Sequence, residues 1–123
     1  MGERGILGGT QTKEHAVGEQ ITWTLNVGNV GSAAGAVTLP EMTVTQLSDG
    51  ADVTAIVTVA LDVMIVVGQT IILKAIGGVV GAIPPLPASL DEGEQYRVDV
   101  IYHKDGHVNL KNEFKLACPD VEP

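Results

Sequence analysis

The chain has 123 residues, of which 45% are hydrophobic, 18% are charged and only 3% are aromatic. That length fits one domain, not two. The net charge of -8 and the scattered basic residues exclude a surface for nucleic acid or anionic membrane, because both contacts need clustered Lys and Arg. Most of the apolar residues are Val, Ile, Ala and Leu, which together with abundant Thr favour strands over helices.

The first segment, residues 1–19, is Gly-rich and polar and shows no sustained period. It predicts an extended N-terminal arm, with Ile6 and Leu7 as candidate anchors on a neighbouring molecule. The arm contains no apolar run of signal-peptide length, so we expect a protein used inside a cell or supplied already cut.

Residues 20–27 alternate cleanly between apolar and polar side chains, which is the period of a half-buried strand. Ile21, Trp23 and Leu25 are therefore candidate core residues. The Gly and Asn residues of segment 28–35 predict a turn or bulge. Two short strands are expected next, over 36–39 and 42–47, with Pro40 between them.

The middle of the chain is apolar on two sides. Every odd position from Val53 to Val67 is apolar, and the even positions are mixed. A straight strand of that length would span roughly 50 Å, so we expect a bend near residues 60–63 that makes two strands. A further strand is expected over 71–76.

Only Asp62 and Lys74 are charged between Val53 and Leu90. The uncharged runs are too short for a membrane-spanning helix, so no membrane span is expected. One face of these strands fits a domain core, and the other needs a cover such as another subunit. The interface candidates are Ile56, Met64, Val66, Ile72 and Ile76.

The last third returns to a two-residue period. Val98 and Val100 lie on the expected inner face of one strand, and Phe114 on that of the next. Asp105-Gly106 between them favours a two-residue hairpin turn that places Lys104 opposite His107. Cys118 is the only cysteine, so no internal disulfide can form, and an intermolecular one stays open. Residues 118–123 read as a short acidic tail after a domain that covers 20–117.

Seven or eight short strands with frequent turn signals predict an antiparallel sandwich or barrel. The run Val17–Ala33, with its Val-Gly-Glu turn, Thr-rich strand and Asn-Val-Gly-Ser-Ala loop, resembles the start of CARDB-type and related conserved-repeat domains. Leu90–Tyr96 is similar to their later Leu-x-x-Gly-Glu turn. This resemblance implies an all-β, immunoglobulin-like sandwich of seven to eight strands.

The residues that could carry chemistry are few. His103 and His107 flank the hairpin turn, and Asp91, Glu92 and Glu94 form an acidic turn, but neither set has the convergent ligands that a zinc or calcium site needs. No nucleophile elbow or phosphate loop occurs. We expect no catalytic residue, no metal and no cofactor, and therefore no enzyme.

The remaining function class is a structural subunit of a large assembly. A small acidic β protein with an arm resembles, in size and architecture, the capsid decoration proteins of tailed bacteriophages. That resemblance implies a virion location and, as partners, the major capsid protein, other copies of the chain, or both. The alternatives are an extracellular or cell-surface immunoglobulin-like adhesion or filament module, and a phage tail-tube subunit.

Overall fold

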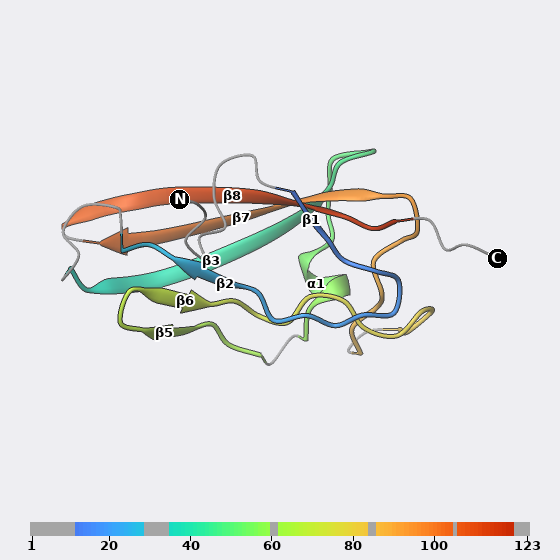
Figure 1. Ribbon diagram of the computed structural model, residues 1–123, viewed down its shortest axis with the longest axis horizontal. Helices are drawn as coiled ribbons and strands as arrows, with labels where there is room; N and C mark the ends of the chain where they lie inside the picture. The colour runs from blue at the N-terminus through green and yellow to red at the C-terminus, as the bar shows by residue number, and fades with distance from the viewer. Residues whose placement is uncertain (1–11, 29–34, 60–61, 84–85, 105, 120–123) are drawn as a thin grey trace.

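The computed structural model describes residues 12–28, 35–59, 62–83, 86–104 and 106–119. Two β-sheets and one short helix make up the regular structure of these residues (Figure 1). The expected all-β class is confirmed at this level.

The larger sheet has five strands in the order β1-β8-β7-β3-β4. Its central strands are long, and all of its pairings are antiparallel except β1 with β8, which run parallel. The strands are β1 (Thr12–Glu14), β3 (Val37–Gln46), β4 (Ala51–Asp52), β7 (Gln95–Lys104) and β8 (His107–Ala117).

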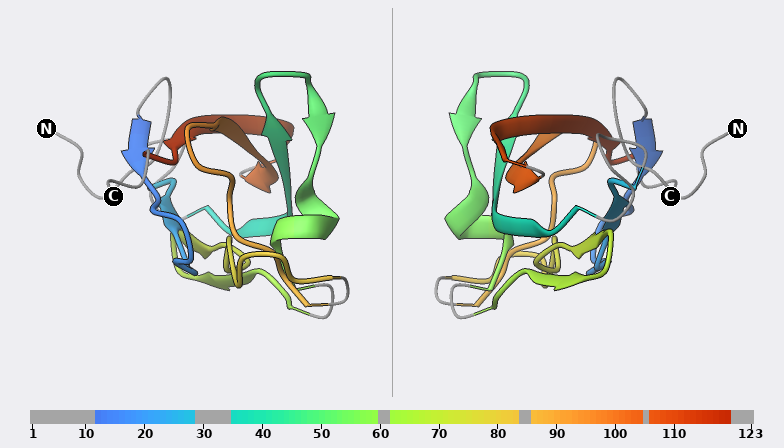
Figure 2. Two further views of the ribbon diagram at one scale, coloured as in Figure 1. Left: turned by 90° about the vertical axis from the view of Figure 1, so that its right-hand side faces the viewer. Right: turned by 90° about the vertical axis from the view of Figure 1, so that its left-hand side faces the viewer.

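The smaller sheet is antiparallel and has the order β2-β6-β5. Its strands are β2 (Thr24–Asn26), β5 (Ile65–Val67) and β6 (Thr70–Ile72). The helix α1 (Thr54–Val57) lies between β4 and β5 in the chain. Seen end-on, the smaller sheet lies below the larger one (Figure 2).

The hydrophobic core lies between the sheets, because β7 and β8 turn alternate side chains inward. Tyr96, Val98, Val100 and Tyr102 are buried on β7, and Phe114 and Leu116 on β8. Leu25 and Ile71 are fully buried in the smaller sheet. Among the expected core residues, Trp23 is partly buried against this core and Ile21 is half-buried. The hairpin register places Lys104 opposite His107, as the sequence predicts.

Strand β3 differs from the two short strands expected around Pro40. It runs from Val37 to Gln46 without interruption, and its register with β7 shifts between Thr38 and Glu41. Leu39 takes a left-handed φ of 53° at this bulge. Pro40 has no N–H to donate, so a bulge lets it stay within the strand.

The expected pair of strands over 53–67 is wrong in its first half. Residues Thr54–Val57 form α1, and strand β5 begins only at Ile65. After the helix, the odd-numbered residues are the exposed ones. Ile65 and Val67 are exposed, whereas Met64 and Val66 pack against the core.

The domain also begins earlier than expected. Strand β1 lies within the predicted arm but pairs with β8, and His15 is completely buried. Ile6 and Leu7 lie outside the described residues. At the other end Cys118, expected in a tail, is buried with its Sγ 3.8 Å from the Leu90 carbonyl oxygen.

Candidate interaction surface

Large exposed apolar side chains are concentrated in the middle of the chain. Within the described ranges, eight of the ten large hydrophobic residues classed as exposed lie between residues 56 and 86. Single exposed apolar residues are ordinary, but a group from one region indicates a surface that binds something. The eight are Ile56, Val63, Ile65, Val67, Val79, Val80, Ile83 and Leu86.

Three of these residues lie on one side of β5 and of the chain just before it. Val63, Ile65 and Val67 are 64%, 50% and 60% exposed. Because successive side chains of a strand point to opposite faces, the intervening Met64 and Val66 turn toward the core. A two-residue turn joins β5 to β6, and the carbonyl of Gln69 in that turn accepts a 2.8 Å bond from the Val27 N–H.

Four more lie on the loop that follows β6. Val79, Val80, Ile83 and Leu86 are 65–75% exposed. We call residues 78–83 and 86–88 the apolar loop. Its base is fixed by backbone hydrogen bonds, from Val79 N–H to the Pro87 carbonyl (3.2 Å) and from Ala88 N–H to the Ile56 carbonyl (2.9 Å). The loop therefore presents apolar side chains from an anchored base.

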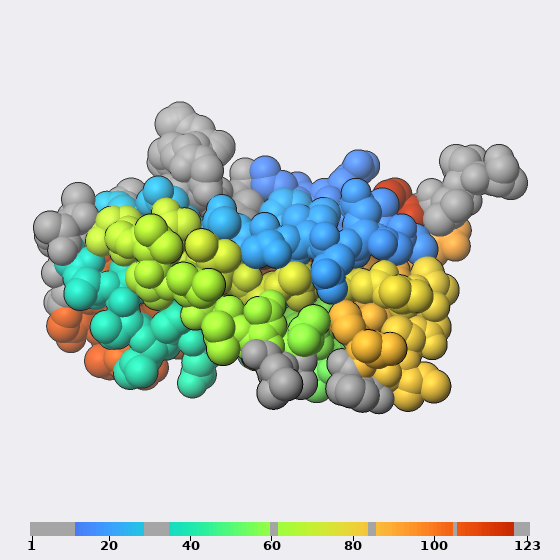
Figure 3. Space-filling view, turned by 90° about the horizontal axis from the view of Figure 1, so that it is seen from below, coloured from blue at the N-terminus to red at the C-terminus, as the bar shows by residue number. Residues whose placement is uncertain are grey.

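Strand β5 and the apolar loop lie on the same side of the molecule. In the view from below, the β5–β6 hairpin and the segment after β6 follow one another along the long axis (Figure 3). We call the side chains that they expose the apolar underside, which consists of Val63, Ile65, Val67, Val79, Val80, Ile83 and Leu86. It holds seven of the ten large exposed hydrophobic side chains in the described part of the chain.

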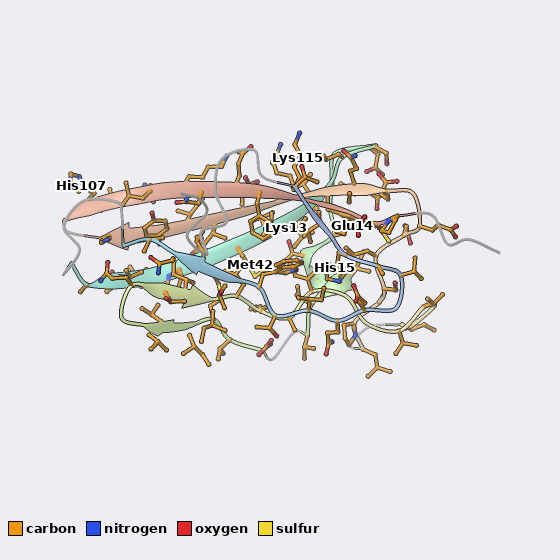
Figure 4. All side chains as sticks on the ribbon, viewed as in Figure 1. Lys13, Glu14, His15, Met42, His107 and Lys115 are labelled. Carbon is orange, nitrogen blue, oxygen red and sulfur yellow. The ribbon has the colours of Figure 1, made fainter. Side chains whose placement is uncertain are left out.

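The outer face of the larger sheet has the opposite character. Arg97 Nε lies 3.0 Å from Asp99 Oδ2, and Lys111 Nζ lies 3.6 Å from Asp99 Oδ1 and 3.9 Å from a Glu113 oxygen. Figure 4 shows Lys115 on this side as well. The basic side chains of these ion pairs, Arg97 and Lys111, are 37% and 50% exposed. Exposed charge suits a face that stays in water, so the two sides of the molecule differ in what they can contact.

An open groove adjoins the underside along the β3 edge. Its volume is about 480 Å³, and Met42 and Met64, which line it, also pack against the core. Glu41, Asp62 and Lys74 supply the charged part of its lining. Asp62 is already engaged, since its carboxylate accepts the N–H groups of Val63 and Ala75 at 3.0 and 3.1 Å.

Sequence reasoning named part of this surface. Ile56 is 45% exposed and borders the apolar loop. Ile72 is half-buried, and Met64 and Val66 are partly buried on the inner side of β5. Ile76 is completely buried through its bridges to Ile21 and Thr58, so it is not available for an interface.

Two buried polar side chains were not anticipated. Lys104 is 1% exposed, and its Nζ donates a 2.6 Å hydrogen bond to the Val27 carbonyl oxygen. Its burial could have been predicted from its position, because Lys104 continues the alternation of the inward residues Tyr96 to Tyr102.

The other is His15. Its Nδ1 accepts a 3.3 Å hydrogen bond from Trp23 Nε1, and its Nε2 lies 3.1 Å from the Glu19 carbonyl oxygen. This pairing fits a neutral imidazole with the proton on Nε2. Burial lowers the pKa of His15 below its ordinary value of 6.5.

The structure brings no metal-ligand group together among the residues it describes. His103 and His107 line a depression of about 370 Å³ with Thr38 at the end of the β7–β8 hairpin. His107 lies far from His15 (Figure 4). No helix within the described ranges is long and apolar enough to cross a membrane.

Comparison with known proteins found no match, either to a protein-family model or to a curated protein.

Proposed function

We propose that this protein is a structural subunit of a larger assembly, most specifically a virion protein of the capsid decoration type. The observation that carries the proposal is the apolar underside, on a face opposite the charged outer side of the larger sheet. Such a subunit stabilises an assembly by mass action, because it binds only the assembled form.

The size of the apolar underside supports the proposal. Complete burial of a Val, Leu or Ile side chain contributes about 1.5–3 kcal/mol. Each of its seven side chains is half to three-quarters exposed, so burying one contributes roughly 1 kcal/mol. The gross gain of about 7 kcal/mol is offset by the translational and rotational entropy lost on binding, estimated at about 4–15 kcal/mol. One subunit alone therefore binds weakly, and a lattice that offers several contacts retains it.

The proposal includes an immunoglobulin-like arrangement of the two sheets, as the resemblance to CARDB-type domains implies. The sheet orders β1-β8-β7-β3-β4 and β2-β6-β5 correspond to immunoglobulin strands A′GFCC′ and BED. Tyr96, at the start of β7, accepts a 2.8 Å hydrogen bond at its hydroxyl from the Asp91 N–H. A tyrosine bonded to backbone a few residues upstream is typical of the corresponding strand in these sandwiches. Burial raises the pKa of Tyr96 to about 12, so this hydroxyl stays protonated at neutral pH.

Sedimentation tests the assembly role. In a lysate of the producing cells the wild-type chain should travel with large particles. A variant with Val79, Val80, Ile83 and Leu86 each changed to Ser should stay in the low-mass fraction. The matched control changes Leu39 and Val108 to Ser, because these residues are equally exposed but lie outside the underside.

Circular dichroism should show the same folded spectrum for all three proteins. A wild-type chain that remains at the mass of free protein contradicts the proposal. Equal particle occupancy for the underside variant and the wild type contradicts it too.

A further inference from the structure

Strand β5 is an edge strand whose outer backbone groups have no partner strand among the described residues. It ends the order β2-β6-β5, and β6 pairs with it on one side only. Alternate residues of an antiparallel strand direct their N–H and C=O groups away from the paired neighbour. The edge therefore offers hydrogen-bonding groups beside three exposed apolar side chains.

The edges of the larger sheet each carry a feature that hinders pairing with another strand. Strand β1 carries Lys13 and Glu14, and β4 has only two residues, one of them Asp52. Strand β3, which β4 covers only at Thr45 and Gln46, contains Pro40 and a bulge. Strand β2, the other edge of the smaller sheet, exposes no large apolar side chain, because its Leu25 is buried.

Strand β5 has none of these features. Its sequence Ile-Val-Val contains no charge and no proline, and its register with β6 is continuous. No charged residue lies between Asp62 and Lys74. An uncharged apolar edge is a template for pairing with another chain.

We propose that β5 pairs antiparallel with β5 of a second copy of this chain, across a two-fold axis near Ile65. The two three-stranded sheets then join into one sheet of six strands. This inference rests on the proposed assembly role, and it names the partner of one part of the apolar underside.

A second copy fits because the edge is its own complement. The residues flanking a two-residue hairpin turn, Val67 and Thr70, form a hydrogen-bonded pair, so Val66 directs its backbone groups outward. If the pairing of two copies extends the strand by one residue, the same alternation makes Met64 the next outward residue. With the axis at Ile65, Met64 of each copy pairs with Val66 of the other. On the outer side, Val63 of each copy then lies beside Val67 of the other, and the two Ile65 side chains meet.

The charges agree with this register. Asp62 of one copy lies opposite Gly68 of the other, so no like charges face each other. Each chain carries a net charge of -8, which repels a second copy at long range. Salt screens that repulsion, so association should tighten as ionic strength rises. A contact limited to one short strand falls below the area of a stable interface, and the free dimer should therefore be weak.

Cross-linking tests the register directly. In a Cys118→Ser background, Ile65→Cys places two thiols across the axis, where facing residues are close enough for a disulfide. The matched control is Val79→Cys, which is more exposed but lies on the apolar loop. Mild oxidation should give at least fivefold more covalent dimer with Ile65→Cys than with Val79→Cys.

Sedimentation equilibrium of the purified chain gives a second measurement. The wild type should approach twice the chain mass as concentration and salt increase, and Ile65→Lys should stay at the mass of one chain with an unchanged folded spectrum. Equal cross-linking at both cysteine positions, or a wild type that stays monomeric at millimolar concentration in high salt, overturns β5 pairing. Those results leave particle binding through the apolar loop untouched, which the loop Ser variant tests separately.

Discussion

Gly77 provides a sharp test of how the apolar loop is anchored. It has a φ of +95°, and its N–H donates a 2.8 Å hydrogen bond to the Val57 carbonyl. A Cβ added there would overlap the Glu19 carbonyl oxygen and lie 2.7 Å from His15 Nε2. Gly77→Ala therefore imposes an unfavourable backbone conformation and displaces the hydrogen bond between His15 and Glu19.

The two effects have separate magnitudes. A left-handed conformation costs a non-glycine residue about 1–2 kcal/mol. Loss of the hydrogen bond, which leaves a buried imidazole N–H without its acceptor, adds about 1–3 kcal/mol. The smaller entropy of the unfolded alanine chain offsets about 0.4–1 kcal/mol of this. Gly77→Ala should thus lower the free energy of unfolding by roughly 1–4.5 kcal/mol.

Gly81→Ala is the matched control. Gly81 has a φ of +78°, but a Cβ there has nothing within 4 Å, so only the conformational cost applies. Gly78→Ala tests the steric effect alone. Gly78 lacks a left-handed φ, but its added Cβ would overlap the Pro87 carbonyl oxygen. Urea unfolding followed by circular dichroism, with m-values compared, measures all three variants. The reasoning is refuted if Gly77→Ala destabilises the protein no more than Gly81→Ala does.

Two further predictions concern titrating and charged groups. The folded-state pKa of His15 lies below 6.5, so the unfolded chain takes up the proton first as pH falls. The free energy of unfolding should therefore fall as pH drops below 6.5, by at most about 1.4 kcal/mol per pH unit. His15→Gln should flatten that slope in urea unfolding, whereas a slope unchanged from wild type would refute the assignment. Lys111 lies between Asp99 and Glu113, which face each other across β7 and β8, so Lys111→Met should destabilise the protein by about 0.5 kcal/mol at low salt. The same substitution should have a smaller effect in a Glu113→Gln background, and equal losses in both backgrounds would show that Lys111 does not screen this pair.

The β7–β8 hairpin was predictable because its determinants are local. A sustained two-residue period predicts the inner faces, and the Asp105-Gly106 dipeptide in the sequence favours a two-residue turn. Lys104 shows where this reasoning stopped short. Its phase placed it inward, but only the fold brings the Val27 carbonyl, 77 residues earlier in the chain, within reach of its ammonium group.

Helix α1 was missed because its buried residues satisfy two periods at once. Val53 and Val57 are both buried, and a spacing of four residues fits an alternating strand as well as one turn of helix. The local signal lay in Asp52, whose carboxylate accepts hydrogen bonds from the N–H and hydroxyl of Thr54 at 3.0 and 2.7 Å. These bonds lower the pKa of Asp52 and fix a turn where the pattern predicted extended chain.

The sequence predicts that the middle of the chain exposes apolar side chains, but not which of them face outward. A long stretch with only Asp62 and Lys74 charged indicates more apolar side chains than a small domain hides. Which side faces outward depends on the helix and the segment after it, which interrupt the alternation that begins at Val53. Met64 and Val66, predicted as interface residues, therefore lie on the inner side, and the exposed row is Val63, Ile65 and Val67.

The unequal length of the two sheets explains why this apolar surface remains outside. Strands β3, β7 and β8 have 10, 10 and 11 residues, whereas each strand of the smaller sheet has three. Three-residue strands supply only one or two inward positions each, since side chains alternate between faces. The apolar residues between Val53 and Leu90 exceed those positions, so the surplus must lie on the outer side of β5 and on the apolar loop. Polar substitution of that surplus should leave the core intact, and this independence is what allows binding to be tested apart from folding.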